Sequence, residues 1–287
     1  MIKIIDTFKN FRDNFENNLN LSIDEKIELW KHTYKEYPEL FTKLKDDYIQ
    51  DGYDWVEIAK TLVFNKTEEN FSKMLEAYNN LLFTLDLINE KAQTVFNIDF
   101  DINIVLYSGL GNSAGWIDTY DNKTAILYGI DKIAELGWQD LNSIKSLIAH
   151  EICHVVHFCI RKKENIIDNY ENTYDYGIWR IYTEGFAQFY QFKLIDSIFN
   201  SRGENWINIC DSNINKLKKL YLNSLNDSKI GVKYFFGDWH EVEGISDVGY
   251  YLGQKFIEQL TKKYSLYNIA TLDFKILERE LIKFLNS

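Results

Sequence analysis

The chain has 287 residues, of which 46% are hydrophobic and 16% aromatic, so it can bury a substantial core and is not a disordered protein. Its formal charge is −11, and an acidic chain releases no counterions from a phosphate backbone, which argues against a nucleic-acid partner. The three cysteines are odd in number and form no Cys-x-x-Cys pair, so no disulfide framework is expected.

The beginning of the sequence has neither a sustained apolar core nor a small-residue cleavage site, so it does not resemble a signal peptide. No apolar run reaches the roughly 18 residues that a membrane-spanning helix requires. We therefore expect a cytoplasmic protein that does not bind a membrane.

Residues 1–95 are predicted to form a helical N-terminal region. Ser22 and Glu25 have the spacing of a capping box, with apolar residues following at helical intervals. The segment from Thr67 to Thr94 carries a long apolar stripe with helical period, which predicts one long helix that packs into the core.

The pattern changes near residue 96, where we place a soft boundary to a second region, residues 96–287. The predicted elements that follow are a strand at Asp101–Tyr107, a loop at Gly109–Gly115, two short strands at Trp116–Tyr120 and Thr124–Tyr128, and a turn between them at Asp121–Asn122. Helical periodicity returns at Asp140 and continues to the end. The fold class is therefore α+β and mostly helical, with a small mixed or antiparallel sheet.

Residues 150–154 read His-Glu-Ile-Cys-His, within a helix that Asp140 or Asn142 can cap. Positions i and i+4 lie on one helix face, so His150 and His154 can bind one Zn²⁺. Glu151 adjoins the first ligand and is the candidate general base. Cys153 points away from the histidine face and is expected to fill space in the core.

A catalytic zinc site has three protein ligands and a water, so a third ligand must come from elsewhere. Glu184, 30 residues after His154, is the preferred candidate, on a second helix that Asn172 can cap. His157 is the alternative, but it lies about 10 Å along the helix from His150, and three ligands on one axis cannot close a tetrahedron.

Residues around Glu184 have predicted supporting roles. Gly185 has no side chain, so it allows the two metal-binding helices to approach closely. Arg180 and Gln188 each lie one turn from Glu184, on its side of the helix. We expect Gln188 to orient a metal-binding histidine through the free ring nitrogen.

These residues resemble the gluzincin type of zincin metallopeptidase, which pairs HExxH with a Glu on a later helix. The chain is more specifically similar to a bacterial family of zinc-dependent proteases that combines HExxH, an E-G-[LF]-A segment and a G-Y-x-x-G segment. Here these segments are His150–His154, Glu184–Ala187 and Gly249–Gly253, within roughly residues 100–262. The resemblance implies a zincin-like core with a small sheet beside the HExxH helix, and peptide-bond hydrolysis.

The expected function is therefore that of a zinc metallopeptidase with one Zn²⁺ per chain, which acts on peptide or protein substrates. Glu151 would accept a proton from the metal-activated water. The strand Thr124–Tyr128 would lie beside the cleft, where it either pairs with an extended peptide or is an ordinary sheet edge. The alternative function is a non-catalytic, zinc-containing binding or regulatory module, although such a module needs no base.

Two further sites have weaker sequence support. Zincins of this type place a Tyr or His donor for the oxyanion after the Glu ligand; Tyr250 ranks first because Gly249 and Gly253 would leave room for substrate beside its ring. His240 ranks second and Tyr251 a distant third. Nucleotide binding at Gly109–Gly111 is disfavoured, because no Lys-Ser/Thr follows and no helix opens from that loop.

Overall fold

The computed structural model describes residues 2–166, 170–195 and 202–287. The chain forms two compact units: residues 1–90 and 99–151 form unit 1, and residues 91–98 and 152–287 form unit 2. The chain passes between the units at three points: inside α5 (Thr67–Phe96), between residues 98 and 99, and inside α7 (Leu141–Lys163). The helical and strand content is that of an α+β protein, mostly helical with a small mixed sheet.

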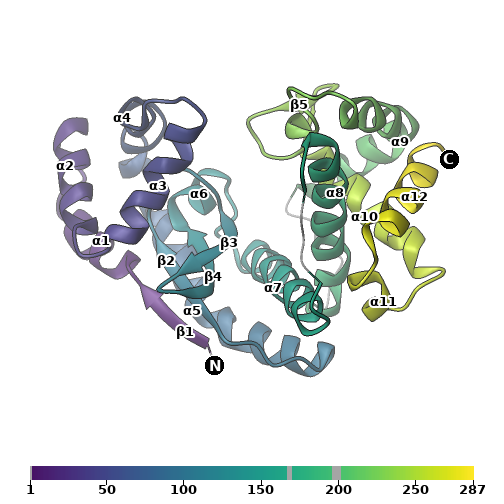
Figure 1. Cartoon of the computed structure of the whole chain (residues 1–287). Coiled ribbons are helices and arrows are strands. Elements are labelled where there is room, and N and C mark those ends of the chain that lie inside the picture. The colour runs from purple at the N-terminus through teal and green to yellow at the C-terminus, as the bar shows by residue number, and fades with distance from the viewer. Residues whose placement is uncertain (1, 167–169, 196–201) are drawn as a thin grey trace. The chain divides into compact units, whose positions relative to one another are not determined.

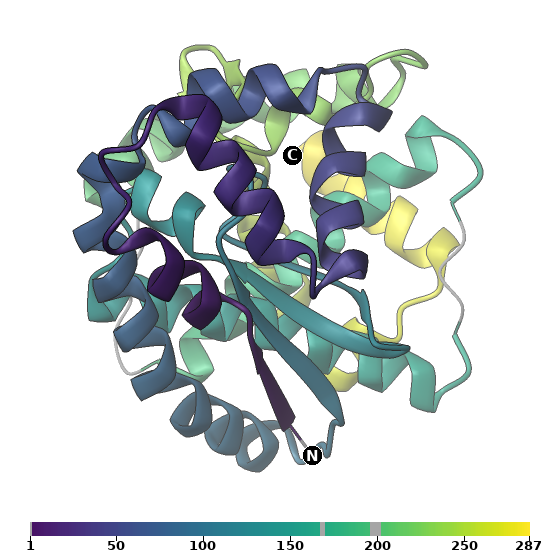
Figure 2. The same cartoon turned by 90° about the vertical axis from the view of Figure 1, so that its left-hand side faces the viewer.

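Unit 1 contains a four-stranded sheet in the order β1-β2-β4-β3 (Figures 1 and 2). Its strands are β1 (Ile2–Asp6), β2 (Ile102–Tyr107), β3 (Gly115–Tyr120) and β4 (Lys123–Gly129). The shorter helical elements are α1 (Phe8–Phe15), α2 (Ile23–Tyr34), α3 (Pro38–Gln50), α4 (Trp55–Ile58), the π-helical segment η1 (Ala59–Phe64) and α6 (Ile130–Glu135). Strands β1, β2 and β4 are parallel, and β3 is antiparallel to β4.

The strand β1 was missed by the sequence analysis, which predicted helices throughout residues 1–95. It pairs with β2 in parallel from Ile2 opposite Ile102 to Asp6 opposite Leu106. The run Ile-Lys-Ile-Ile-Asp is short, and its partner lies about a hundred residues away, so periodicity alone gave little signal. The N-terminal segment thus completes the sheet of the later region.

The two central strands of the sheet lie between other strands. All of β2 is buried, because strands flank it on both sides and helices cover the sheet (Figure 2). β4 pairs with β2 on one side and β3 on the other. The suggestion that Thr124–Tyr128 pairs with a peptide is therefore wrong, and β3 is the strand at the edge.

The two faces of β3 contact different helices, since successive strand residues point to opposite sides. Asp118 forms an ion pair with Lys43 of α3 at 2.7 Å, so the face bearing Trp116 and Asp118 is turned toward α3. Gly115 lies against Glu151 of α7 on the other face, where a methyl group added to Gly115 would be 2.9 Å from the Glu151 Cγ. Helices α1, α2 and α3 lie in front of the sheet in Figure 2.

Several local predictions for unit 1 are confirmed. Ser22 and Glu25 form the full capping box at the start of α2. The predicted long helix is α5, and most of its apolar stripe is buried, although Leu82 is 39% exposed. The predicted turn at Asp121 and Asn122 joins β3 to β4 with φ of 53° and 56°, the backbone that a two-residue hairpin turn requires.

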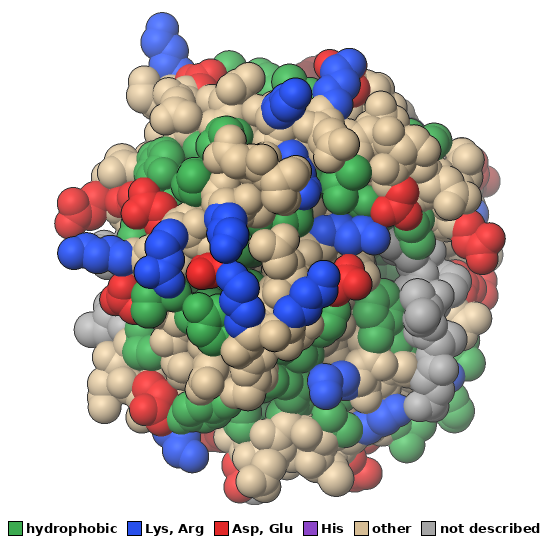
Figure 3. Space-filling model, turned by 90° about the vertical axis from the view of Figure 1, so that its right-hand side faces the viewer, with side chains coloured by type: hydrophobic (Ala, Val, Ile, Leu, Met, Phe, Trp, Pro, Cys, Tyr) green, Lys and Arg blue, Asp and Glu red, His purple; other side chains and the backbone are tan. Residues whose placement is uncertain are grey.

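Unit 2 is built of helices around α8 (Thr173–Tyr190). Its other elements are α9 (Gly203–Leu225), α10 (Val248–Thr261), α11 (Leu266–Ala270), α12 (Phe274–Leu285), the 3-10 turns η2 (Gln191–Lys193) and η3 (Lys233–Phe235), and a two-stranded ribbon of β5 (Glu241–Val242) and β6 (Ile245–Ser246). Lys and Arg side chains gather on the face seen in Figure 3, which carries the C-terminal helices. Among the described residues, no helix combines the length and apolar character that crossing a bilayer requires.

Helices α8 and α10 cross in backbone contact at two glycines. A methyl group on Gly185 would lie 2.3 Å from the Gly253 carbonyl oxygen, and one on Gly253 would lie 2.6 Å from that of Ile181. The expectation that Gly185 brings the two metal-binding helices together is therefore wrong, because this glycine faces α10. Any side chain here would force the helices apart, so the crossing fixes where α8 presents Glu184.

Candidate metal centre

Helix α7 carries the two histidines at adjacent turns of one face. Asp140 caps this helix by accepting hydrogen bonds from the amides of Asn142 at 2.9 Å and Ser143 at 3.1 Å, which settles the choice between the two predicted caps. Since α7 is one continuous helix, the spacing of His150 and His154 is set by the helix itself.

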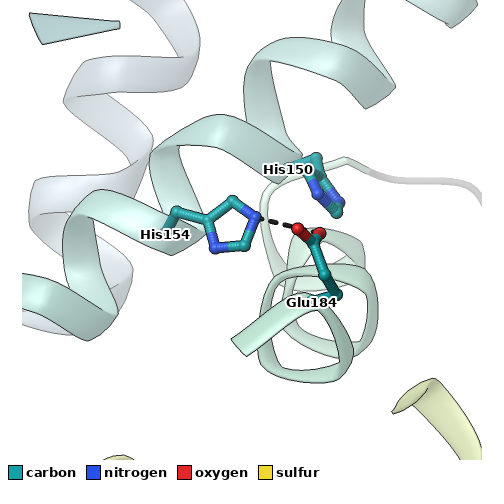
Figure 4. Close-up of side chains that lie close together, drawn as sticks. All are labelled: His150, His154 and Glu184. Atoms are coloured by element: carbon teal, nitrogen blue, oxygen red, sulfur yellow. Dashed lines mark hydrogen bonds and ion pairs between the residues drawn. The ribbon is translucent and has the colours of Figure 1, made fainter. Parts of the chain in front are cut away.

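Helix α8 supplies the third member of the group. The Asn172 side chain caps it by accepting from the Asp175 amide at 2.9 Å, as predicted. Glu184 is buried, and its Oε2 lies 3.2 Å from Nε2 of His154. One ligand atom from each of His150, His154 and Glu184 lies within 4.8 Å of the others, and the three side chains converge in Figure 4.

This group fits a divalent metal. Two imidazole nitrogens and one carboxylate oxygen are a donor set that zinc accepts, and zinc–ligand bonds of about 2.0–2.1 Å imply ligand atoms about 3.3 Å apart in a tetrahedron. The separation of 3.2 Å between His154 and Glu184 matches that edge. The group could therefore hold a metal ion, with His150 closing the triangle from the preceding turn.

The rival ligand His157 lies outside this group. Its Nε2 is 3.1 Å from the Tyr182 hydroxyl, and its ring stacks on Phe186 at 4.4 Å. Burial, and then the charge of Arg161, lower the pKa of His157, so it is a neutral core imidazole. Cys153 is fully buried, as predicted, and the three cysteines are free thiols.

Arg180 lies one turn before Glu184, on the side of the helix that its spacing predicted, and it contacts the Glu184 carboxylate. Its Nη1 is 3.1 Å from Glu184 Oε1, while Oε2 faces His154. The guanidinium therefore holds one carboxylate oxygen and leaves the other turned toward the histidines. Gln188 is also buried on α8, and its contact with an imidazole stays a prediction.

We expect Arg180→Gln to weaken zinc binding by about 10- to 100-fold, the range for losing a partner that orients a metal ligand. Competition with a chromophoric chelator measures this affinity directly. Arg279→Gln, which removes an exposed arginine from α12, is the matched control and should leave zinc affinity unchanged. Equal zinc affinities of wild type and Arg180→Gln would show that Glu184 needs no such support.

Glu151 lies between the two histidines in sequence and is buried, with 6% of its surface exposed. Its carboxylate packs against Gly115, whose hypothetical methyl group would be 2.9 Å from Glu151 Oε1. Only glycine leaves that space at the first residue of β3. Gly115 was predicted to lie in a loop, and its contact with Glu151 was not predicted, because the HExxH pattern gives no signal for it.

The candidate oxyanion donors lie in unit 2. Burial, and then the charge of Glu184, raise the pKa of Tyr250, so its phenol stays protonated at neutral pH. The predicted space beside its ring is absent: Phe236 fills the position next to Gly249, 2.4 Å from a hypothetical methyl group, and Gly253 faces Gly185. His240 packs against the ring of Tyr234 at 4.5 Å, and Tyr251 bonds to Asp211.

The glycine loop at 109–111 is organised by a protein carboxylate. Asp131 accepts hydrogen bonds from the amides of Gly109 and Gly111, both at 2.8 Å. Amides that a buried carboxylate already occupies cannot cradle a phosphate. This geometry removes nucleotide binding at the loop from consideration.

Comparisons with protein families, curated proteins and solved structures gave no match to this chain.

Proposed function

We propose that this protein is a zinc-dependent peptidase with a zincin-like core. The observation that carries the proposal is the group of His150, His154 and Glu184, with the carboxylate of Glu151 on the same helix as the two histidines. Three protein ligands leave one coordination position open, which is typical of catalytic zinc and not of structural zinc. When bound, zinc would polarise the peptide carbonyl and lower the pKa of water at the open position.

The chain's own residues have distinct roles in this proposal. Glu151 accepts the proton of the attacking water and returns it to the leaving amine. Arg180 keeps the Glu184 carboxylate in place, and Gly115 leaves space for Glu151 beside β3. An extended peptide substrate pairs with the edge strand β3, and not with residues 124–128 as the sequence suggested.

The experiment that tests the proposal is cleavage of an unfolded protein, reduced and alkylated casein, by the purified chain. We expect cleavage with one equivalent of zinc, no cleavage when a chelator removes the zinc, and renewed cleavage when zinc is restored. A chain that binds one zinc and cleaves neither casein nor a diverse peptide library would instead support the non-catalytic module.

We expect Tyr250→Phe to lower kcat by about 10²–10³-fold, the usual cost of removing one oxyanion donor. KM and zinc content should change little, because the phenol would act on charge that develops during the reaction. His240→Ala is the comparison, since it removes the second-ranked donor. If His240→Ala loses activity and Tyr250→Phe does not, the role belongs to the histidine.

A further inference from the structure

The outer edge of β3 presents backbone groups to an added chain. The Gly129 amide donates to the Ala114 carbonyl oxygen at 3.1 Å, which makes these residues a hydrogen-bonded pair. Such pairs alternate along an antiparallel ladder, so Ile117, three residues after Ala114, directs its N–H and C=O away from β4. Within the described residues no strand pairs with that side of β3.

Neighbouring groups confirm this direction. The Gly115 carbonyl oxygen accepts from the Ser113 hydroxyl at 2.8 Å, and the Thr119 amide donates to its neighbour Asp118 at 2.6 Å, so both point away from the ladder. Ile117 lies between these occupied positions. Its amide and carbonyl are where an extended peptide can add to the sheet.

A cavity of about 680 Å³ lies between α3 and β3, on the face of β3 that bears Trp116 and Asp118. Its charged lining residues are Glu39, Asp46, Asp47, Asp118 and Lys43. Lys43 pairs with Asp118, so the acidic groups remain in excess. We call this cavity the α3–β3 groove.

The loop before β3 is hydrogen-bonded to α3, the helix on the other side of the groove. The Asn112 amide donates to the Leu44 carbonyl oxygen at 3.0 Å and to Asp47 Oδ2 at 2.9 Å, which ties this loop to α3.

The groove belongs to the unit that carries the negative charge of the chain. Unit 1 has 26 Asp and Glu residues against 14 Lys and Arg, so the net negative charge of the chain comes entirely from this unit.

We propose that the α3–β3 groove binds Lys and Arg side chains of an extended peptide paired with β3, so that the enzyme prefers basic segments. Side chains of an added strand alternate between the faces of the sheet. One set would therefore enter the acidic groove, and the other would lie on the face where Glu151 packs against Gly115. This inference rests on the proposed peptidase function for its occupant.

Binding of short labelled peptides tests the groove without requiring turnover. Fluorescence anisotropy would compare a peptide that alternates Lys and Thr with one that alternates Glu and Thr. We expect the Lys peptide to bind about tenfold or more tightly, since several exposed ion pairs each contribute a small factor. Added salt should reduce the difference, because exposed charges are screened.

Two variants and one control locate the binding. Asp46→Lys reverses one groove charge and should weaken binding of the Lys peptide by about 3- to 10-fold. Glu76→Lys makes the same change on an exposed turn of α5 and should have no such effect. Ile117→Pro removes an amide that the ladder does not use, so the chain should fold while its affinity for the Lys peptide falls.

The outcomes separate this inference from the proposed function. Equal binding of the two peptides, or equal effects of Asp46→Lys and Glu76→Lys, would overturn the groove even in an active peptidase. If the Lys peptide binds as expected to the chelated protein but zinc causes no cleavage, the groove stands as a peptide site and the peptidase proposal fails.

Discussion

His154→Ala is expected to abolish stoichiometric zinc binding. The imidazole is one of only three protein donors in the group, and its Nε2 lies 3.2 Å from Glu184 Oε2. The loss should therefore exceed the roughly 10- to 100-fold that residues supporting the ligands contribute. Metal analysis of the purified variant, with chelator competition for any residual site, measures the effect.

The control for this variant is His32→Ala, which removes an exposed histidine of α2 and should leave one zinc per chain. His150→Ala should behave as His154→Ala does, and Glu184→Ala should weaken binding by about 10-fold or more. A full zinc equivalent retained tightly by Glu184→Ala would contradict the assignment of the third ligand.

Glu151→Gln is expected to keep the metal and the fold while hydrolysis falls by about 10²–10⁴-fold. The amide has nearly the same shape as the carboxylate, so it still fits against Gly115, but it cannot accept a proton from water. Steady-state cleavage of a peptide, measured at equal zinc occupancy, gives the result.

The matched control is Glu69→Gln, an exposed change in α5 with the same loss of charge. It should cleave at the wild-type rate. Glu151→Gln that turns over substrate as fast as wild type would show that another group accepts the proton.

The metal group was largely predictable from local spacing. HExxH sets two donors at adjacent helical turns, and the Asn172 cap and Asp175 indicated where a second helix begins. Glu184 was preferred because His157 lies too far along the same helix axis, and the side of the helix on which Arg180 lies followed from its one-turn spacing. Each of these inferences used the period of a helix, which the sequence carries directly.

The sequence did not indicate which residues far apart along the chain contact each other in the fold. Gly185 was assigned to the wrong helix pair, because a glycine indicates close approach without naming the partner, here Gly253 of α10. Likewise, the glycine at 249 suggested space beside Tyr250, but the sequence did not indicate that Phe236 occupies this space. The strand order, which makes β3 and not β4 the edge, depends on β1 and on pairing between residues far apart in sequence.

The most direct test of this account is anomalous X-ray scattering at the zinc absorption edge, from crystals of the zinc-loaded protein. We expect one strong peak bonded to a ring nitrogen of His150, a ring nitrogen of His154 and a carboxylate oxygen of Glu184, at about 2.0–2.2 Å from each. A peak ligated by His157, or a zinc-loaded crystal with no peak between α7 and α8 at this group, would contradict it.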